Sequence, residues 1–314
     1  MLSRRTMIGT IAALAALAAG PALAQQERMP VVATFSILGD LVKQVGGERI
    51  DLAVLVGPNG DAHVYSPSPT DAKKLAAAKV VFVNGLKFEG WIDRLVKASG
   101  TKAMVVAAAK SVKPIEAAEE EHVHDHGKGD DKSHDHDHGG FDPHAWQDIA
   151  NAKLYVAAIR DGLAAADPAG RQVYEANAKA YLDRLDALDA EVRAALAAIP
   201  EAQRKIITAH DAFGYFTRAY GVQFIAPQGV STEAEASAKD VGRIIRQIKA
   251  QKIKAVFLEN ISDPRLVERI AKETGARMGG RLYSDALSEP AGPAGTYIDM
   301  MRHNIRTLTA ALTS

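Results

Sequence analysis

The 314 residues of this chain include no cysteine. The chain therefore forms no disulfide, and its stability has to come from hydrophobic packing. It also cannot hold a metal ion through thiolates. Any metal site must be built from imidazole nitrogen and carboxylate oxygen, the other common side-chain ligands.

The chain has no excess of charge of either sign, because 38 lysines and arginines balance 38 aspartates and glutamates. A nucleic-acid-binding domain normally shows a clear excess of basic residues, and so does a protein that is held on membranes by charge. We therefore expect no nucleic-acid partner.

The only apolar run that could serve as a membrane segment is short and lies at the amino terminus. Arg4 and Arg5 precede apolar residues 8–19, and Ala-Leu-Ala at 22–24 provides a small-x-small cleavage site. A membrane span needs about 20 apolar residues. Residues 1–24 are therefore predicted to be a cleavable signal peptide, for the Sec or the twin-arginine route, and the mature protein is predicted to work in the periplasm.

One stretch stands out by its composition. Residues 119–140 read EEEHVHDHGKGDDKSHDHDHGG and carry six of the ten histidines, namely His122, His124, His126, His134, His136 and His138. Such a sequence has almost no apolar side chains to bury, so we predict a loop over 116–140. Neutral imidazole is a common metal ligand, and the stretch predicts a weak, secondary zinc role. The alternative is a solvated loop whose metal binding is incidental.

The rest of the chain alternates between short apolar runs and helical patterns. Runs rich in β-branched residues predict strands at the start of 31–47 and at 50–58, 78–85, 101–109, 205–210, 222–227, 254–260 and 276–284. Helices are predicted between and after them, including 71–78, 90–99, 212–221, 234–251, 263–275 and 296–312. This alternation predicts an α/β fold of two similar lobes with parallel-rich sheets.

A long helix is predicted between the two lobes. From Tyr174 to Ile199, apolar residues recur every three or four positions, and Asp167-Pro168 and Pro200 mark the ends. We therefore divide the chain into an amino-terminal lobe over 25–166, a bridging helix over 167–200 and a carboxy-terminal lobe over 201–314. A ligand would occupy the cleft at the carboxyl ends of the strands.

Four polar residues outside the histidine-rich stretch occupy positions that face such a cleft. His63, His210 and Asp285 follow predicted strands, and His144 begins a helical segment. Three imidazoles and one carboxylate could complete a tetrahedral zinc site. Taken singly, a histidine in a globular protein is usually a surface or hydrogen-bonded residue, and this is the alternative for each of the three. His303 lies inside the last predicted helix, and we interpret it as structural or exposed.

Four motifs carry a resemblance to a known family. Residues 61–67 (DAHVYSP), 142–146 (DPHAW), 210–216 (HDAFGYF) and 283–285 (YSD) resemble the cluster 9, or cluster A-I, metal-specific solute-binding proteins of ABC transporters. The similarity covers nearly the whole mature chain in order and spacing. It includes the histidine-rich insertion of the zinc-type members.

The resemblance implies a ligand set and a function. It implies that His63, His144, His210 and Asp285 bind the metal, in a cleft between two lobes joined by a rigid helix. The family's first motif usually has proline where Ala62 stands, and many manganese binders have glutamate where His210 stands. We therefore expect a periplasmic protein that captures Zn²⁺ and delivers it to a membrane permease, with manganese or dual specificity as the alternative.

This function implies a set of partners, and two other classes of protein are alternatives to it. We expect a monomer that docks on the permease, and we leave open a periplasmic metallochaperone that loads it. A secreted zinc hydrolase would need a general base, and Glu259 at a strand end is the one candidate, although we interpret it as a residue behind a ligand or at an interface. The third class is a surface adhesin. We expect no enzymatic activity.

Overall fold

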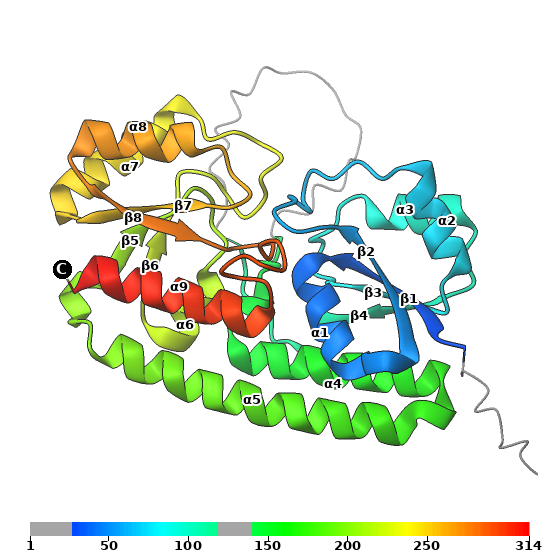
Figure 1. The fold of residues 1–314 in the computed structure, drawn as a ribbon. Helices are drawn as coiled ribbons and strands as arrows, with labels where there is room; N and C mark the ends of the chain where they lie inside the picture. Colours follow the sequence, from blue (N-terminus) through cyan, green and yellow to red (C-terminus); the bar gives the residue numbers. More distant parts are fainter. Residues whose placement is uncertain (1–26, 118–139, 314) are drawn as a thin grey trace, which may run out of the picture.

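The computed structural model of this protein describes residues 27–117 and 140–313. These residues form two lobes, each built on a four-stranded sheet in which all strands are parallel (Figure 1). The predicted α/β fold with two similar lobes is confirmed. The predicted signal peptide and the six clustered histidines lie outside the described residues.

The first lobe contains a sheet with the strand order β2-β1-β3-β4. Its strands are β1 (Met29–Phe35), β2 (Ile50–Val56), β3 (Val80–Val83) and β4 (Met104–Ala107), and they are connected through α1 (Ser36–Gly46), α2 (Pro69–Ala77) and α3 (Ile92–Ser99). The short valine-rich strand β3 is buried along its whole length, because helices and neighbouring strands cover it.

The second lobe repeats this topology, with the strand order β6-β5-β7-β8. Its strands are β5 (Lys205–Ile207), β6 (Gln223–Ile225), β7 (Ala255–Glu259) and β8 (Arg277–Leu282), and its helices are α6 (Gly214–Tyr220), α7 (Ala238–Gln251), α8 (Pro264–Thr274) and α9 (Tyr297–Leu312). In both sheets the chain reverses its direction of winding between the first and third strands. Ligands of open parallel sheets bind at the carboxyl ends of the strands at this point.

Two helices connect the lobes. α4 (Ile149–Ala166) packs on the first lobe, and α5 (Arg171–Ala197) extends beneath both lobes, where it contacts α1 on one side and α9 on the other (Figure 1). The apolar stripe predicted from Tyr174 to Ile199 is buried as expected. Within the described part of the chain, no helix combines the length and the apolar character that a membrane crossing requires.

Two helix starts differ from their sequence predictions. The helix predicted at 234–251 begins only at Ala238, because the side chain of Ser237 accepts a hydrogen bond from the Asp240 N–H and caps the helix there. Asp167 caps a 3₁₀ turn at Pro168–Gly170, and α5 follows at Arg171. Local capping chemistry therefore sets both boundaries.

Candidate metal centre

The structure brings the four predicted ligands together at the carboxyl ends of the strands. His63 follows β2, His210 follows β5 and Asp285 follows β8, whereas His144 stands just before a 3₁₀ turn at Ala145–Gln147. Each offers one ligand atom, and these atoms all lie within 4.8 Å of one another. All four residues are buried, with His63 the most exposed at 5%.

The three imidazoles converge on the Asp285 carboxylate through their Nε2 atoms. Asp285 Oδ2 lies 3.2 Å from His63 Nε2 and 3.1 Å from His210 Nε2. Asp285 Oδ1 lies 3.5 Å from His144 Nε2, and the His63 and His144 Nε2 atoms are 3.3 Å apart. Asp285 Oδ1 is also buried without a hydrogen-bond partner among the described residues. The donor set therefore suits one divalent cation at its centre.

A carboxylate behind His144 sets the orientation of its ring. Asp142 Oδ1 accepts the backbone N–H of His144 at 2.9 Å and lies 2.8 Å from its Nδ1. This turn, in which an aspartate binds the backbone two residues later, is typical of Asp-Pro sequences. It leaves Nε2 of His144 directed at the cluster. Asp142 belongs to the DPHAW motif, and its spacing of two residues from His144 is the signal that could have predicted this role.

His210 also has a carboxylate against its Nδ1, and this carboxylate comes from another strand. Glu259 ends β7, and its Oε2 lies 2.6 Å from His210 Nδ1. Its Oε1 accepts the backbone N–H groups of Ala209 and His210, at 2.7 and 3.0 Å. The interpretation of Glu259 as a residue behind a ligand agrees with this geometry.

His63 is positioned by its own loop and by packing. Its backbone N–H donates to Asp61 Oδ1 at 2.9 Å, and the other Asp61 oxygen accepts the Thr232 hydroxyl from the second lobe at 2.6 Å. The ring meets Phe88 edge to face, with centroids 4.6 Å apart. Burial lowers the pKa of His63, even though Asp285 acts to raise it. Burial therefore favours the neutral form of the His63 imidazole.

The other two imidazoles have the opposite electrostatic balance. Burial would lower the pKa of His144, but Asp285 and then Asp142 outweigh it and raise the pKa to about 9. The pKa of His210 is also raised, because nearby carboxylates overcome the effect of burial. The pKa of Asp285 lies well below its usual range despite burial, because His144 and His210 stabilise its charge. A divalent cation that displaces the two imidazole protons leaves the buried charge unchanged.

The Asp285 loop is fixed by hydrogen bonds that cross between the lobes. Trp146 Nε1 and Gln147 Nε2 both donate to the Ser284 carbonyl, at 3.0 and 2.7 Å. Trp146 and Gln147 are only two and three residues after His144 in the chain. Ligands from the first and second lobes are therefore connected through one short segment.

The remaining histidine of the described chain lies apart from the cluster. His303 is on α9, and its Nε2 lies 3.0 Å from the Arg281 carbonyl oxygen. It is a hydrogen-bonded helix residue, as predicted.

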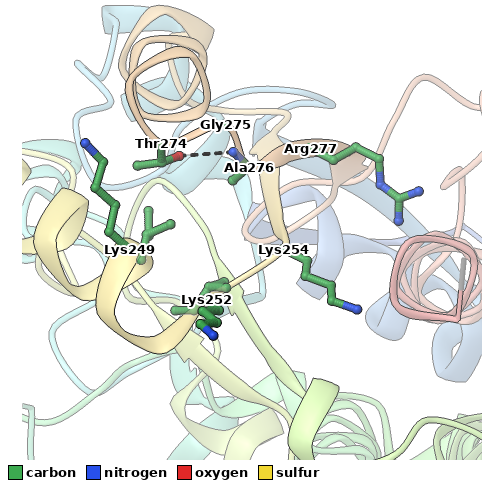
Figure 2. A pocket seen from close by; sticks show the side chains of 9 residues that line it. Lys249, Lys252, Lys254, Thr274, Gly275, Ala276 and Arg277 are labelled. Atoms are coloured by element: carbon green, nitrogen blue, oxygen red, sulfur yellow. Dashed lines mark hydrogen bonds between the residues drawn. The ribbon is translucent and has the colours of Figure 1, made fainter.

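A separate cavity of about 470 Å³ lies at the amino ends of β7 and β8, at the opposite end of these strands from the cluster (Figure 2). Lys249, Lys252, Lys254 and Arg277 surround it. The carboxyl end of α7 lies here, and basic residues offset the partial negative charge of a helix carboxyl end. The lining contains no imidazole or carboxylate, so this cavity is not a metal site.

Comparison with known proteins agrees with this fold and cluster. A model of the ZnuA family, described as the periplasmic component A of a zinc-uptake complex, matches residues 31–311. The chain belongs to the ZnuA family. It is 35% identical over 294 residues to the manganese-binding lipoprotein MntA of Bacillus subtilis, which covers 91% of this chain and 90% of that protein.

Two further relatives are similar to this chain over nearly their full length. The iron ABC transporter substrate-binding lipoprotein MtsA of Streptococcus pyogenes is 32% identical over 301 residues, covering 93% of this chain and 92% of that protein. The periplasmic zinc-binding protein TroA of Treponema pallidum has a structure that superimposes with a TM-score of 0.80 at 32% identity, covering 91% of this chain and 99% of that one. The chain is thus a metal-binding substrate-binding protein of an ABC transporter, a family of solute-binding proteins rather than enzymes.

Proposed function

We propose that this protein binds Zn²⁺ through His63, His144, His210 and Asp285 and delivers it to the membrane permease of an ABC importer. The observation that carries the proposal is the buried cluster itself, with three Nε2 atoms and one carboxylate within 4.8 Å of one another. A tetrahedral zinc ion with bonds of about 2.0–2.1 Å separates its ligand atoms by about 3.3 Å. Four of the contacts within the cluster, at 3.1–3.5 Å, are close to this value.

The choice of zinc rests on the ligand type. Three nitrogen ligands and one oxygen ligand favour zinc over manganese, which prefers oxygen-rich, octahedral sites. The relatives are named for manganese, iron and zinc, so family membership alone leaves the metal open. Manganese, or both metals, remains the alternative cargo.

A competitive titration tests the metal. The protein from Gln25 onward is stripped of metal and titrated with Zn²⁺ and Mn²⁺ against a chelating indicator. We expect one tight Zn²⁺ site per chain and much weaker Mn²⁺ binding. His144→Ala should abolish the tight site, whereas His303→Ala, a histidine outside the cluster, should leave it unchanged. Manganese binding equal to or tighter than zinc binding would refute the zinc assignment.

A secreted zinc hydrolase is disfavoured by the position of its candidate base. Glu259 contacts Nδ1 of His210, the ring nitrogen that points away from the cluster, and also binds two backbone N–H groups. It therefore lies behind the ligand, on the side of the ring away from the cluster, which is the wrong place for a base that activates a metal-bound water.

We further propose how the protein works in the cell. It is exported by its signal peptide to the periplasm and acts there as a monomer with lobes at 25–166 and 201–314 joined by a bridging segment at 167–200. It docks on the permease and can receive zinc from a metallochaperone. The six histidines from His122 to His138 bind zinc more weakly than the cluster and serve it as an accessory.

A further inference from the structure

The contact between Glu259 and His210 joins residues that are far apart in the sequence. Glu259 is 3% exposed and lies at the end of β7, next to the end of β5 in the sheet, where His210 follows. Two backbone N–H groups, those of Ala209 and His210, donate to Oε1 of its carboxylate, and the ring Nδ1 of His210 lies 2.6 Å from Oε2. The side chain thus holds both the backbone and the ring of one ligand.

We propose that Glu259 is a positioning residue that makes His210 a metal ligand. This inference rests on the proposed function. A neutral imidazole can offer Nε2 to a metal only when its proton is on Nδ1, and a carboxylate at Nδ1 selects this tautomer. The contact at Nδ1 also holds the ring so that Nε2 lies 3.1 Å from Asp285 Oδ2, within the cluster. Glu259 therefore sets the tautomer and the direction of the ligand together.

The number of N–H groups explains why the residue has to be a glutamate. A carboxylate has two acceptor oxygens and can take all three donors, whereas a glutamine amide has one acceptor oxygen and an NH₂ group. If the amide oxygen of a glutamine faced the backbone, its NH₂ would face Nδ1 and favour the tautomer that carries the proton on Nε2. If the amide were flipped, its NH₂ group would face the two backbone N–H groups, and donors facing donors form no hydrogen bonds. Neither orientation satisfies the site.

His144 also has a carboxylate at its Nδ1, but this carboxylate is positioned differently. Asp142 lies two residues from His144 and is placed by its own turn. Glu259 lies 49 residues from His210 and is placed by a neighbouring strand. The alignment of His210 therefore depends on the pairing of β5 with β7. Movement of one strand against the other would weaken metal binding.

The test compares Glu259→Gln with the same substitution at Glu89. Glu89 is also buried at 3% exposed, but its Oε1 accepts the Asn84 N–H and the Thr34 hydroxyl instead of binding a ligand imidazole. Zinc affinity of the full mature protein is measured by competition at pH 7. We expect Glu259→Gln to lose about 10- to 100-fold in zinc affinity, as changes behind metal ligands commonly do. Glu89→Gln should bind zinc as the unmodified protein does.

Two further measurements separate positioning from a general structural effect. In ¹⁵N-histidine NMR spectra of the metal-free protein, Glu259→Gln should change the His210 ring signals, and Glu89→Gln should not. In a His210→Ala background, Glu259→Gln should change zinc affinity by less than about twofold, because its effect passes through His210. If Glu259→Gln lowers the melting temperature, the same comparison shows whether the loss of zinc affinity comes through His210 or from general destabilisation.

The possible outcomes distinguish this inference from the proposed function. If the unmodified protein binds zinc and Glu259→Gln binds it within twofold, the positioning role is wrong. The role is equally wrong if the loss is the same size in the His210→Ala background. If the unmodified protein does not bind zinc tightly, the proposed function itself fails.

Discussion

Replacing His210 with glutamate is the most informative change to the metal centre. It exchanges a nitrogen ligand for an oxygen ligand, which by donor type alone should shift preference from zinc toward manganese. In this protein, however, the new carboxylate would stand beside Glu259, whose Oε2 lies 2.6 Å from the His210 ring. We therefore predict that His210→Glu alone weakens binding of both metals.

The size of the effect follows from the repulsion between two buried carboxylates. At a separation of about 4–5 Å and an effective dielectric constant of about 20, two unit charges interact by about 3–4 kcal/mol. The two carboxylates either repel each other directly, or one of them keeps a proton. In both cases the free-energy cost corresponds to a loss of about two to three orders of magnitude in metal affinity. Glu259→Gln lowers metal affinity when His210 is present. In the His210→Glu background it should instead raise metal affinity, because it removes one of the two repelling charges.

The assay measures Zn²⁺ and Mn²⁺ affinities of four proteins: unmodified, His210→Glu, Glu259→Gln and the double variant. We expect the double variant to bind Mn²⁺ about 10-fold or more tighter than His210→Glu alone, with the repulsion of about 3–4 kcal/mol as the upper limit. Melting temperatures of the metal-free proteins control for folding. If His210→Glu alone binds Mn²⁺ at least 10-fold more tightly than the unmodified protein, and Glu259→Gln adds nothing, the electrostatic reasoning is wrong.

Three further predictions concern stability and the histidine-rich stretch. Burial opposes ionisation of Asp71, but hydrogen bonds led by those from Ser68 outweigh it and lower its pKa to about 2. Because this pKa lies below the unfolded value, the carboxylate contributes about 2 kcal/mol above pH 4, which is lost as the pH falls toward 2. Urea unfolding should show a penalty for Asp71→Asn at pH 7 that largely disappears near pH 2, and an equal penalty at both pH values would contradict this. Gly279→Ala should lower the unfolding free energy by about 1–3 kcal/mol, because its Cβ would lie 2.5 Å from the Phe257 ring, and unchanged chemical denaturation would count against it. Deleting residues 118–139, whose flanking residues are hydrogen-bonded to each other, should preserve one tight zinc site in calorimetric titration and remove the weaker ones. Loss of the tight site would refute the four-ligand assignment.

Sequence patterns predicted the elements of this fold well where the determinants are local. Short β-branched runs correspond to the strands of both sheets, and the stripe from Tyr174 to Ile199 corresponds to the buried face of α5. The predicted start of α7 was wrong by four residues, because Ser237 caps the helix and α7 begins only after it. A cap is a single side-chain hydrogen bond, and the apolar pattern does not report it.

The candidate ligands were also accessible from the sequence. His63, His210 and Asp285 lie in the loops that follow strands, and in a parallel sheet the carboxyl ends of strands meet on one side. The position of a residue after a strand thus predicts that it faces the cleft. It does not predict the distance to another ligand, which depends on the order of the strands.

The sequence by itself determined the chemistry available to this protein: no thiolate, a set of imidazoles and carboxylates at strand ends, and a long amphipathic helix between two α/β halves. Only the tertiary structure decided how these groups are paired. The contacts between Glu259 and His210 and between Asp61 and Thr232 join residues from different strands or different lobes. They depend on which strands lie side by side and on how the lobes pack on α5. These are sums of many weak, non-local contacts, and no local pattern in the sequence records them.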